Sequence, residues 1–379
     1  MITSMSSPML KSARAFVTRV RPAYLCSLGT AIPQGRLDNA ALAARFQGLT
    51  VEGIESRTGI HCRRIATDHE TTSDLALAAG LQALRRSEIS PDQLDLVLIG
   101  TATPDHLMPA TACRLQHALA ARHAVAMDVS AACSGFLYCL WIAQQMIQTG
   151  QADHVLVAGA EIMSRIVDPN DANSAILFGD GAGAAVLSAA EGPYRLGRFW
   201  GRTLGGEYDA LIRGGGAAPA PAGSQPGASG EYFIKMDGRR VFRAAVEGFS
   251  QAIQQTAARN GLSLADLDWI VPHQANARII QEVARRLEFP SDRFWLNLSR
   301  YGNTGAASIP LAMDELHSSG AVTPGGCVLL ACVGAGMTIG GLPLFAERLH
   351  VPALLHERSD GERTCRAVER VTGSDRPER

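Results

Sequence analysis

The most constraining feature of this sequence is an internal repeat with a fixed separation. Leu94–Leu96 (LDL) opens a short apolar run, and Leu267–Trp269 (LDW) opens another at an offset of 173 (267 − 94). Val155 and Val328, each in a further apolar run, are separated by the same offset (328 − 155). Independent segments rarely keep one separation, so two motifs with a shared offset indicate a duplicated unit. The chain is therefore predicted to fold as two similar halves.

Short apolar runs alternate with helix-like segments in both halves. The first half has predicted strands at 94–101, 124–129, 154–162 and 178–190, and predicted helices at 111–121 and 135–150. The second half has predicted strands at 267–274, 294–298 and 327–336, and predicted helices at 275–287 and 304–320. Apolar runs of this length between helices are typical of buried strands in a sheet covered on both faces. The fold class is thus predicted to be α/β.

Changes in composition divide the chain into four parts. Residues 1–23 are basic and contain no acidic residue, and we expect a flexible leader. The two halves then cover 24–190, with the candidate nucleophile, and 191–350. Residues 351–379 are rich in Arg, Glu, Ser and Asp, and we expect a polar tail. Between the halves, 214–230 is dominated by Gly, Ala, Pro and Ser, which predicts a surface loop.

The overall charge and the cysteines exclude several classes of function. A formal net charge of −1 provides no general attraction to nucleic acid or to an anionic membrane. No apolar run reaches the roughly 18 residues that a membrane-spanning helix needs. The eight cysteines are spread along the chain with no C-x-x-C pair, which is typical of reduced thiols in the cytoplasm. We predict no metal site and expect a cytoplasmic protein.

The stretch DVSAACSGF, residues 128–136, places Cys133 between a predicted strand and a predicted helix. The free N–H groups and the dipole at a helix N-terminus favour an anion, so we expect a lowered pKa for this thiol. The small neighbouring residues leave room for a bulky acyl group. The alternative is a structural thiol that is buried simply as a small apolar side chain.

Two polar residues of the second half stand where a predicted strand ends and a predicted helix begins. VPHQAN (271–276) places His273 there, and RYGNTG (300–305) places Asn303. Functional groups of parallel sheets gather at the carboxyl ends of strands, so both residues and Cys133 are expected to converge. A thiolate can accept an acyl group, and a neutral imidazole and a carboxamide can stabilise an enolate oxygen. The set therefore favours acyl-thioester chemistry.

These motifs resemble those of β-ketoacyl-acyl-carrier-protein synthase III, a family of condensing enzymes in the thiolase superfamily. DVSAACSGF, FGDGAGAAVL, VPHQANARII and YGNTGAAS carry the resemblance, which extends from about Tyr24 to Glu347. It implies a thiolase-like five-layered αβαβα fold made of two duplicated halves, and a homodimer. It also implies a ping-pong reaction, in which an acyl group moves from coenzyme A to the cysteine and malonyl-acyl carrier protein then decarboxylates and attacks it. Coenzyme A or phosphopantetheine thioesters would be substrates, with no permanently bound cofactor.

The resemblance assigns a role to each candidate catalytic residue. Cys133 corresponds to the nucleophile, and His273 and Asn303 to the pair that assists decarboxylation. The main-chain N–H groups of Cys133 and Ala335 correspond to the oxyanion hole. Ala335 stands where the family usually has glycine, a change that keeps the main-chain donor.

Three further residues match substrate-binding positions of the family. Arg57 corresponds to an arginine near the coenzyme A nucleotide, and Asn276 to a residue that lines the pantetheine tunnel. Met108 corresponds to a residue, often aromatic, that crosses the dimer interface to close the partner's acyl pocket. Methionine is flexible, which leaves the acyl-chain preference open.

The sequence departs from the family pattern at the nucleotide. Gly53 replaces a tryptophan that stacks on adenine, and Ala172 replaces a second arginine. Losing both is expected to weaken nucleotide recognition by about two orders of magnitude. Either Arg202 or Arg213 compensates, or a carrier protein is the acyl donor.

Basic residues predict a docking surface for an acidic acyl carrier protein. Arg278, Arg285 and Arg286 share one face of a predicted helix, and Arg243 belongs to a second group, at 239–243. The resemblance assigns similar positions to carrier-protein docking. The alternative is an ordinary solvated charged face.

The leading functional hypothesis is decarboxylating condensation in fatty-acid or polyketide-type biosynthesis. The alternative is a related acyltransferase that passes the acyl group to an alcohol or amine in secondary metabolism. A third possibility is a non-catalytic scaffold with the same fold. Retention of His273 and Asn303 favours condensation.

Overall fold

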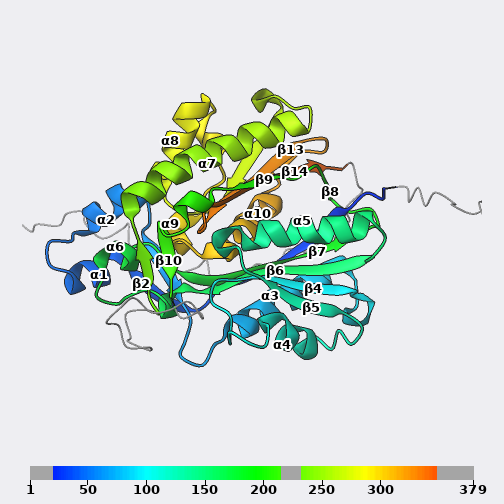
Figure 1. Cartoon of the computed structure of the whole chain (residues 1–379), viewed down its shortest axis with the longest axis horizontal. Coiled ribbons are helices and arrows are strands. Elements are labelled where there is room, and N and C mark those ends of the chain that lie inside the picture. Colours follow the sequence, from blue (N-terminus) through cyan, green and yellow to red (C-terminus); the bar gives the residue numbers. More distant parts are fainter. Residues whose placement is uncertain (1–19, 215–231, 348–379) are drawn as a thin grey trace, which may run out of the picture. The chain divides into compact units, whose positions relative to one another are not determined.

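The computed structural model describes residues 20–214 and 232–347 (Figure 1). The predicted polar tail (351–379) and all but residues 20–23 of the predicted leader lie outside the described residues. The predicted surface loop likewise lies outside them, except for Gly214. Among the helices described, none is long and apolar enough to cross a membrane.

The secondary structure follows the predicted alternation in both halves. The first half contains β1 (Tyr24–Ala31), β2 (Gly35–Asp38), α1 (Asn39–Arg45), α2 (Val51–Thr58), β3 (Cys62–Ile65), α3 (Thr72–Ser87), β4 (Leu96–Gly100), α4 (Thr111–Ala118), β5 (Val125–Val129), α5 (Gly135–Gln148), β6 (His154–Ile162), α6 (Ala172–Ala175) and β7 (Asp180–Ser188). The second half contains β8 (Tyr194–Leu196), β9 (Trp200–Thr203), β10 (Leu211–Arg213), β11 (Ile234–Met236), α7 (Gly238–Arg259), β12 (Trp269–Pro272), α8 (Ala277–Leu287), α9 (Leu298–Tyr301), α10 (Ser308–Ser319), β13 (Cys327–Gly334) and β14 (Thr338–Ala346).

One continuous sheet connects the two halves. Its strand order is β12-β13-β14-β8-β1-β7-β6-β4-β5, and β9 adds to β14. β4 is parallel to β5 and β6, and β12 is parallel to β13, whereas β7 and β14 run antiparallel to their neighbours. The halves join where β1 pairs with β8, at Tyr24–Arg195 and Leu25–Tyr194.

The sequence offset between the halves is confirmed in the strand register. β4 begins at Leu96 and β12 begins at Trp269, which is the offset found in the sequence (269 − 96). Leu96 pairs with Val155 of β6, and Trp269 pairs with Val328 of β13, so both pairs obey the offset. The preceding aspartates have the same role, since the carboxylate of Asp95 accepts from the start of β6 and that of Asp268 accepts from the start of β13. The duplication found in the sequence is therefore also present in the structure.

Helices lie on the outer faces of the sheet halves and between them, which confirms the five-layered thiolase-like prediction (Figure 1). Leu96 and Leu98 of β4 pack in the central cluster with α5, whereas Val97 and Ile99 pack in the outer cluster with α3 and α4. α7 and α8 cover the second half in the same way. Because successive strand residues point to opposite faces, covering both faces requires the continuous apolar runs seen in the sequence.

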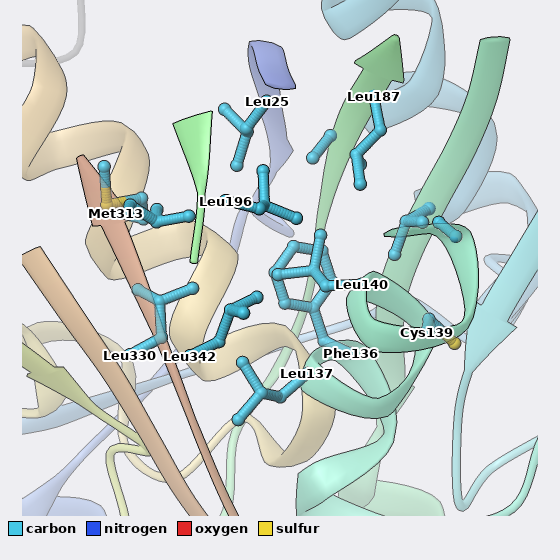
Figure 2. Packing of buried hydrophobic residues seen from close by; sticks show 14 of the residues in the cluster. Leu25, Phe136, Leu137, Cys139, Leu140, Leu187, Leu196, Met313, Leu330 and Leu342 are labelled. Atoms are coloured by element: carbon cyan, nitrogen blue, oxygen red, sulfur yellow. The ribbon is translucent and has the colours of Figure 1, made fainter. Parts of the chain in front are cut away.

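The central layer is built from α5 and α10. Figure 2 shows Phe136 and Leu140 of α5 between leucines of both sheet halves, among them Leu187 and Leu342. All four side chains are 1% exposed or less. Each buried side chain of this size stabilises the fold by roughly 1.5–3 kcal/mol. This packing fixes the start of α5, where the candidate nucleophile lies.

The predicted strand at 294–298 is wrong. Only one bridge forms there, between Phe294 and Ile270 of β12. The side-chain Oε1 of Gln274 accepts hydrogen bonds from the main-chain N–H groups of Asn297 and Leu298, at 3.0 and 3.2 Å. Because a side chain occupies those donors, the segment cannot continue a strand ladder, and α9 begins at Leu298.

Candidate active site

Cys133 lies in a single 3₁₀ turn, Ala132–Ser134, that leads from β5 directly into α5. Ala132 adopts a left-handed conformation, with φ 47°. The duplicated turn begins at Gly305, at the same sequence offset (305 − 132), and this glycine has φ 54°. The same sharp turn thus precedes α5 and α10, although the first copy uses a residue that pays a steric cost there. The turn holds Cys133 just beyond the end of β5.

The turn between β13 and β14 packs directly on the turn that holds Cys133. Ser134 Oγ donates to the carbonyl of Thr338 at 3.1 Å, and Thr338 Oγ1 lies 3.3 Å from the carbonyl oxygen of Ala131. A Cβ atom on Gly334 would lie 2.8 Å from that same carbonyl oxygen and from the N of Ser134. Only glycine permits this approach. It brings the main chain of Ala335, the next residue, beside Cys133.

His273 is held at the end of β12. Its N–H donates to the carbonyl of Ala331 at 2.8 Å, and its carbonyl accepts from Ala275 at 2.9 Å. The side chain is buried, and burial lowers its pKa to about 4, an effect partly opposed by the main chain of Gly305. The imidazole is therefore neutral at pH 7. Its Nδ1 has no hydrogen-bond partner among the described residues.

Asn303 is held against the first half of the chain. Its N–H donates to the carbonyl of Leu177 at 2.8 Å, and its carbonyl accepts from Gly179 at 3.0 Å. The side-chain Oδ1 accepts from the N–H of Gly305 at 3.0 Å. Because the oxygen is occupied, the Nδ2 end of the carboxamide is left to donate to a ligand. The loop after α9 is thus oriented by contacts across both halves.

Cys133, His273, Asn303 and Ala335 line one cavity of about 680 Å³. Its apolar wall is formed by Ile176, Leu177, Phe178, Leu211, Met236, Phe249 and Met337. Its remaining lining includes the exposed arginines Arg57, Arg239 and Arg278. The cavity therefore runs from a basic outer end to a half-buried thiol, with a size and lining suited to a small apolar acyl group. Within residues 20–214 and 232–347, no three His, Cys, Asp or Glu side chains are grouped to hold a metal ion.

The expected lowering of the Cys133 pKa is wrong. Burial raises the pKa of this thiol to about 12, and the nearby carboxyl of Glu161 and thiol of Cys332 act in the same direction. The helix N-terminus is present as predicted, but its favourable field is smaller than the cost of burying a charge. The thiol therefore keeps its proton at neutral pH.

The other candidate substrate-binding residues divide into two groups. Asn276 caps α8, and its Nδ2 donates to the carbonyl of Arg57 at 3.1 Å, so these two cavity residues are held together. Met108 is not among the cavity-lining residues. It follows β4 in a loop and is 87% exposed, which places it on the surface of this chain.

Gly53 and Ala172 replace family residues that contact the nucleotide of coenzyme A. The locations of Arg202 and Arg213 do not support the expectation that either one compensates for this loss. Neither lines the cavity that contains Cys133. Arg213 donates to the carbonyls of Ala102 and Tyr232 and borders a separate cavity. Arg239 lines the main cavity instead. The sequence placed Arg239 only in a general basic group, because its direction depends on where α7 begins.

A shallow groove beside the cavity contains all four arginines predicted for docking. Arg243 of α7 and Arg278, Arg285 and Arg286 of α8 line it. Arg285 forms an ion pair with Glu282 of the same helix, so part of its charge is neutralised. Arg278 lines both the groove and the cavity, which are therefore adjacent.

Sequence reasoning missed one buried ionisable residue behind the cavity. Glu161 is fully buried near the end of β6, and burial raises its pKa to about 7. In the sequence, Glu161 is visible as an isolated acidic residue in the apolar run HVLVAGAEI. Lys, Glu, Arg and Asp are almost never fully buried unless paired, so this position was recognisable as unusual.

Comparison with known proteins places the chain among condensing enzymes. Residues 127–202 match the family described as 3-oxoacyl-[acyl-carrier-protein] synthase III, and residues 257–344 match the C-terminal part of that family. A β-ketoacyl-[acyl-carrier-protein] synthase III from Paramagnetospirillum magneticum is 43% identical over 320 residues, which cover 82% of this chain and 95% of the relative.

Solved structures agree with this similarity. 3-Oxoacyl-[acyl-carrier-protein] synthase III from Aquifex aeolicus is 36% identical, with a TM-score of 0.78, over 85% of this chain and 99% of that one. The priming β-ketosynthase from the R1128 polyketide biosynthetic pathway is 34% identical, with a TM-score of 0.79, over 87% of this chain and 97% of that one.

Proposed function

Because this chain belongs to the 3-oxoacyl-[acyl-carrier-protein] synthase III family, we infer that it catalyses a decarboxylating Claisen condensation. The reaction joins an acyl thioester to malonyl-acyl carrier protein, through an acyl-cysteine, in fatty-acid or polyketide-type biosynthesis. The observation that carries the assignment is the cavity shared by a thiol, a neutral imidazole and a carboxamide. Both groups suited to stabilising an enolate are present, which favours condensation over acyl transfer to an alcohol or amine.

The first half-reaction acylates Cys133. As the thiol attacks the thioester carbonyl, its proton passes to His273, a neutral base in the same cavity. A bond forms between Sγ and the acyl carbon, and the bond to the leaving thiol breaks, so that thiol takes up the proton. The N–H groups of Cys133 and Ala335 receive the negative oxygen of the tetrahedral intermediate. A thiol with a pKa of about 12 makes this base essential.

The second half-reaction extends the acyl group. The bond between the malonyl methylene and its carboxylate breaks, carbon dioxide leaves, and the electron pair forms a thioester enolate. His273 and Asn303 donate hydrogen bonds to the enolate oxygen, and the Nδ2 of Asn303 is the unused donor for this purpose. The enolate carbon then attacks the acyl-cysteine, the bond to Sγ breaks as the new carbon–carbon bond forms, and the departing thiolate of Cys133 takes a proton from water. The chemistry uses no bound cofactor.

The acyl donor is proposed to be a phosphopantetheine thioester, carried by coenzyme A or by acyl carrier protein. Arg57, Arg239 and Arg278 at the exposed end of the cavity suit the phosphate that both carriers share. Neither Gly53 nor Ala172 lines this cavity, so the added contacts to adenine expected of the family are not supplied there.

A second copy of the chain is the proposed structural partner. β5 is an edge strand whose Val125 and Met127 are 60% and 40% exposed, and the loop after β4 exposes Leu107 and Met108. An exposed apolar edge strand is a template for pairing with another chain. We propose that this edge forms a homodimer. A cytoplasmic location is proposed because the seven cysteines among the described residues are free thiols.

The function is tested by supplying both substrates. Incubation with a panel of acyl-coenzyme A and acyl-carrier-protein thioesters plus malonyl-acyl carrier protein should release carbon dioxide and form an equal amount of β-ketoacyl-acyl carrier protein, measured by mass spectrometry. Omitting the acyl donor is the control. Transfer of the acyl group to an added alcohol or amine, with no carbon dioxide released, would instead establish the alternative function.

Docking of the carrier protein is tested at the groove. Reversing two of its charges, with Arg243→Glu and Arg286→Glu together, should raise the apparent KM for malonyl-acyl carrier protein by about tenfold or more, with little change in kcat. These arginines line the groove and would attract an acidic partner. Steady-state kinetics measures the effect, and the exposed Arg122, which lies outside the groove, provides the control Arg122→Glu. An unchanged KM in the double variant would rule out docking here.

A further inference from the structure

Glu161 is held by donors from two directions. On one side its carboxylate accepts from Thr101 Oγ1 at 3.2 Å, from the N–H of Ala102 at 3.0 Å, and from Thr103 Oγ1 at 2.6 Å. On the other side it accepts from the N–H of Ala306 at 3.4 Å. These donors belong to the segment that follows β4 and to the turn that precedes α10. A single buried carboxylate therefore connects a loop of the first half to a turn of the second.

The connected turn is the one that orients Asn303. Gly305 donates its N–H to Asn303 Oδ1, and its main chain interacts with His273. A Cβ atom on Gly305 would lie only 2.9 Å from Cγ of Glu161. The glutamate thus packs directly behind the turn whose other side touches both members of the decarboxylation pair.

We propose that Glu161 is a positioning residue, whose carboxylate fixes the turn Gly305–Ala307 so that Asn303 and His273 face Cys133. The geometry stands on the contacts above, whereas the reaction that it serves rests on the proposed function. The role is separate from catalysis itself, because the carboxylate is buried behind the turn and is not among the cavity-lining residues.

The effect of the charge has a definite sign. Glu161, whose pKa is about 7, is mostly ionised above pH 7, and its negative charge raises the pKa of Cys133. Among the described residues, its charge acts on the titratable groups of Cys133 and of Arg213 on β10. The segments that contact it, 101–103 and 305–307, and its neighbour Gly181 on β7 contain no titratable side chain. Removing the charge should therefore make the thiol easier to ionise at pH 7–9.

Glu161→Gln separates the charge from the positioning. The amide keeps the size of the side chain, its oxygen can accept from Ala102 and Ala306, and its NH₂ group can donate to the hydroxyls of Thr101 and Thr103. Glu161→Ala removes both the charge and the contacts. Asp180→Asn is the matched control, because Asp180 is also buried and accepts from Ala66 and Ser164, but does not influence Cys133.

Two measurements test separately the effect of the Glu161 charge and its positioning role. Alkylation of Cys133 by iodoacetamide, followed by peptide mass spectrometry from pH 7 to 9, reports thiol ionisation, with the exposed Cys113 as the internal reference. Decarboxylation of malonyl-acyl carrier protein reports Asn303 and His273. We expect Glu161→Gln to raise Cys133 alkylation by about tenfold while decarboxylation stays within about threefold. Glu161→Ala should lower decarboxylation by about tenfold or more.

The outcomes that overturn the proposal are distinct from failure of the proposed function. An unchanged alkylation profile in Glu161→Gln would eliminate the effect of the charge, and normal decarboxylation in Glu161→Ala would eliminate the positioning role. If the alanine variant does not fold, a tenfold loss of decarboxylation in Glu161→Gln would overturn the proposal, because that variant keeps the contacts. Thr103→Val removes the shortest hydrogen bond to the carboxylate and should raise alkylation in the same direction. A wild-type protein that does not decarboxylate malonyl-acyl carrier protein would refute the proposed function. The alkylation results would still test the effect of the Glu161 charge on the Cys133 thiol.

Discussion

Cys133→Ala is expected to abolish the acyl-enzyme and to lower condensation by more than about a thousandfold, because Cys133 is the only thiol among the described residues that line the cavity. Decarboxylation of malonyl-acyl carrier protein should persist, since His273 and Asn303 remain in place. Intact-mass spectrometry after incubation with an acyl thioester measures the adduct, and release of carbon dioxide measures the residual half-reaction.

The matched control is Cys139→Ala. Cys139 is a buried thiol on α5, six residues (139 − 133) beyond Cys133, and packs in the central core. That variant should lose some stability through the missing sulfur but still form the adduct. An adduct that survives in Cys133→Ala and maps to another cysteine would show that the nucleophile has been misassigned.

The fold was predictable because short local motifs recur in both halves of the sequence at one offset. Strands buried on both faces must be apolar throughout, so β4, β6 and β13 were visible as runs, and the shared offset related them. The segment 294–298 was equally apolar but does not form a strand, because the side chain of Gln274 takes its main-chain donors. Such competition between a side chain and a ladder depends on tertiary contacts that no local pattern contains.

The candidate site was predictable where its residues follow strands, and not where it depends on burial. Cys133 and His273 lie at the ends of predicted strands that do form, whereas the strand predicted before Asn303 does not, and all three residues line the same cavity. The direction of the Cys133 pKa was wrong because a helix N-terminus can be recognised locally, whereas the depth of burial and the nearby Glu161 follow from the whole fold. The role proposed for Glu161 depends on hydrogen-bond donors that lie 58 to 145 residues away along the chain.

Asn303→Ala should lower decarboxylation of malonyl-acyl carrier protein by about a hundredfold or more, the usual effect of removing one donor to a developing oxyanion. Acylation of Cys133 should change by only a few fold, because the carboxamide has no part in that step. His273→Ala should impair both half-reactions, since the imidazole is the proposed base for the thiol and a donor to the enolate. Single-turnover acylation and carbon dioxide release, measured separately, distinguish these patterns. Equal losses of both half-reactions in Asn303→Ala would contradict the division of roles.

The pH dependence supplies an independent check on His273. An exposed histidine becomes protonated as the pH falls through about 6.5, but burial lowers the pKa of His273 to about 4. The imidazole therefore stays neutral between pH 7 and 5, and decarboxylation should not decline through a transition near 6.5 over that range. The rate of carbon dioxide release in Cys133→Ala isolates this step from the titration of the nucleophile. A decline centred near pH 6.5 that disappears in His273→Asn would mean that the imidazole is accessible to protons, and that its burial does not hold it in the neutral form that the enolate requires.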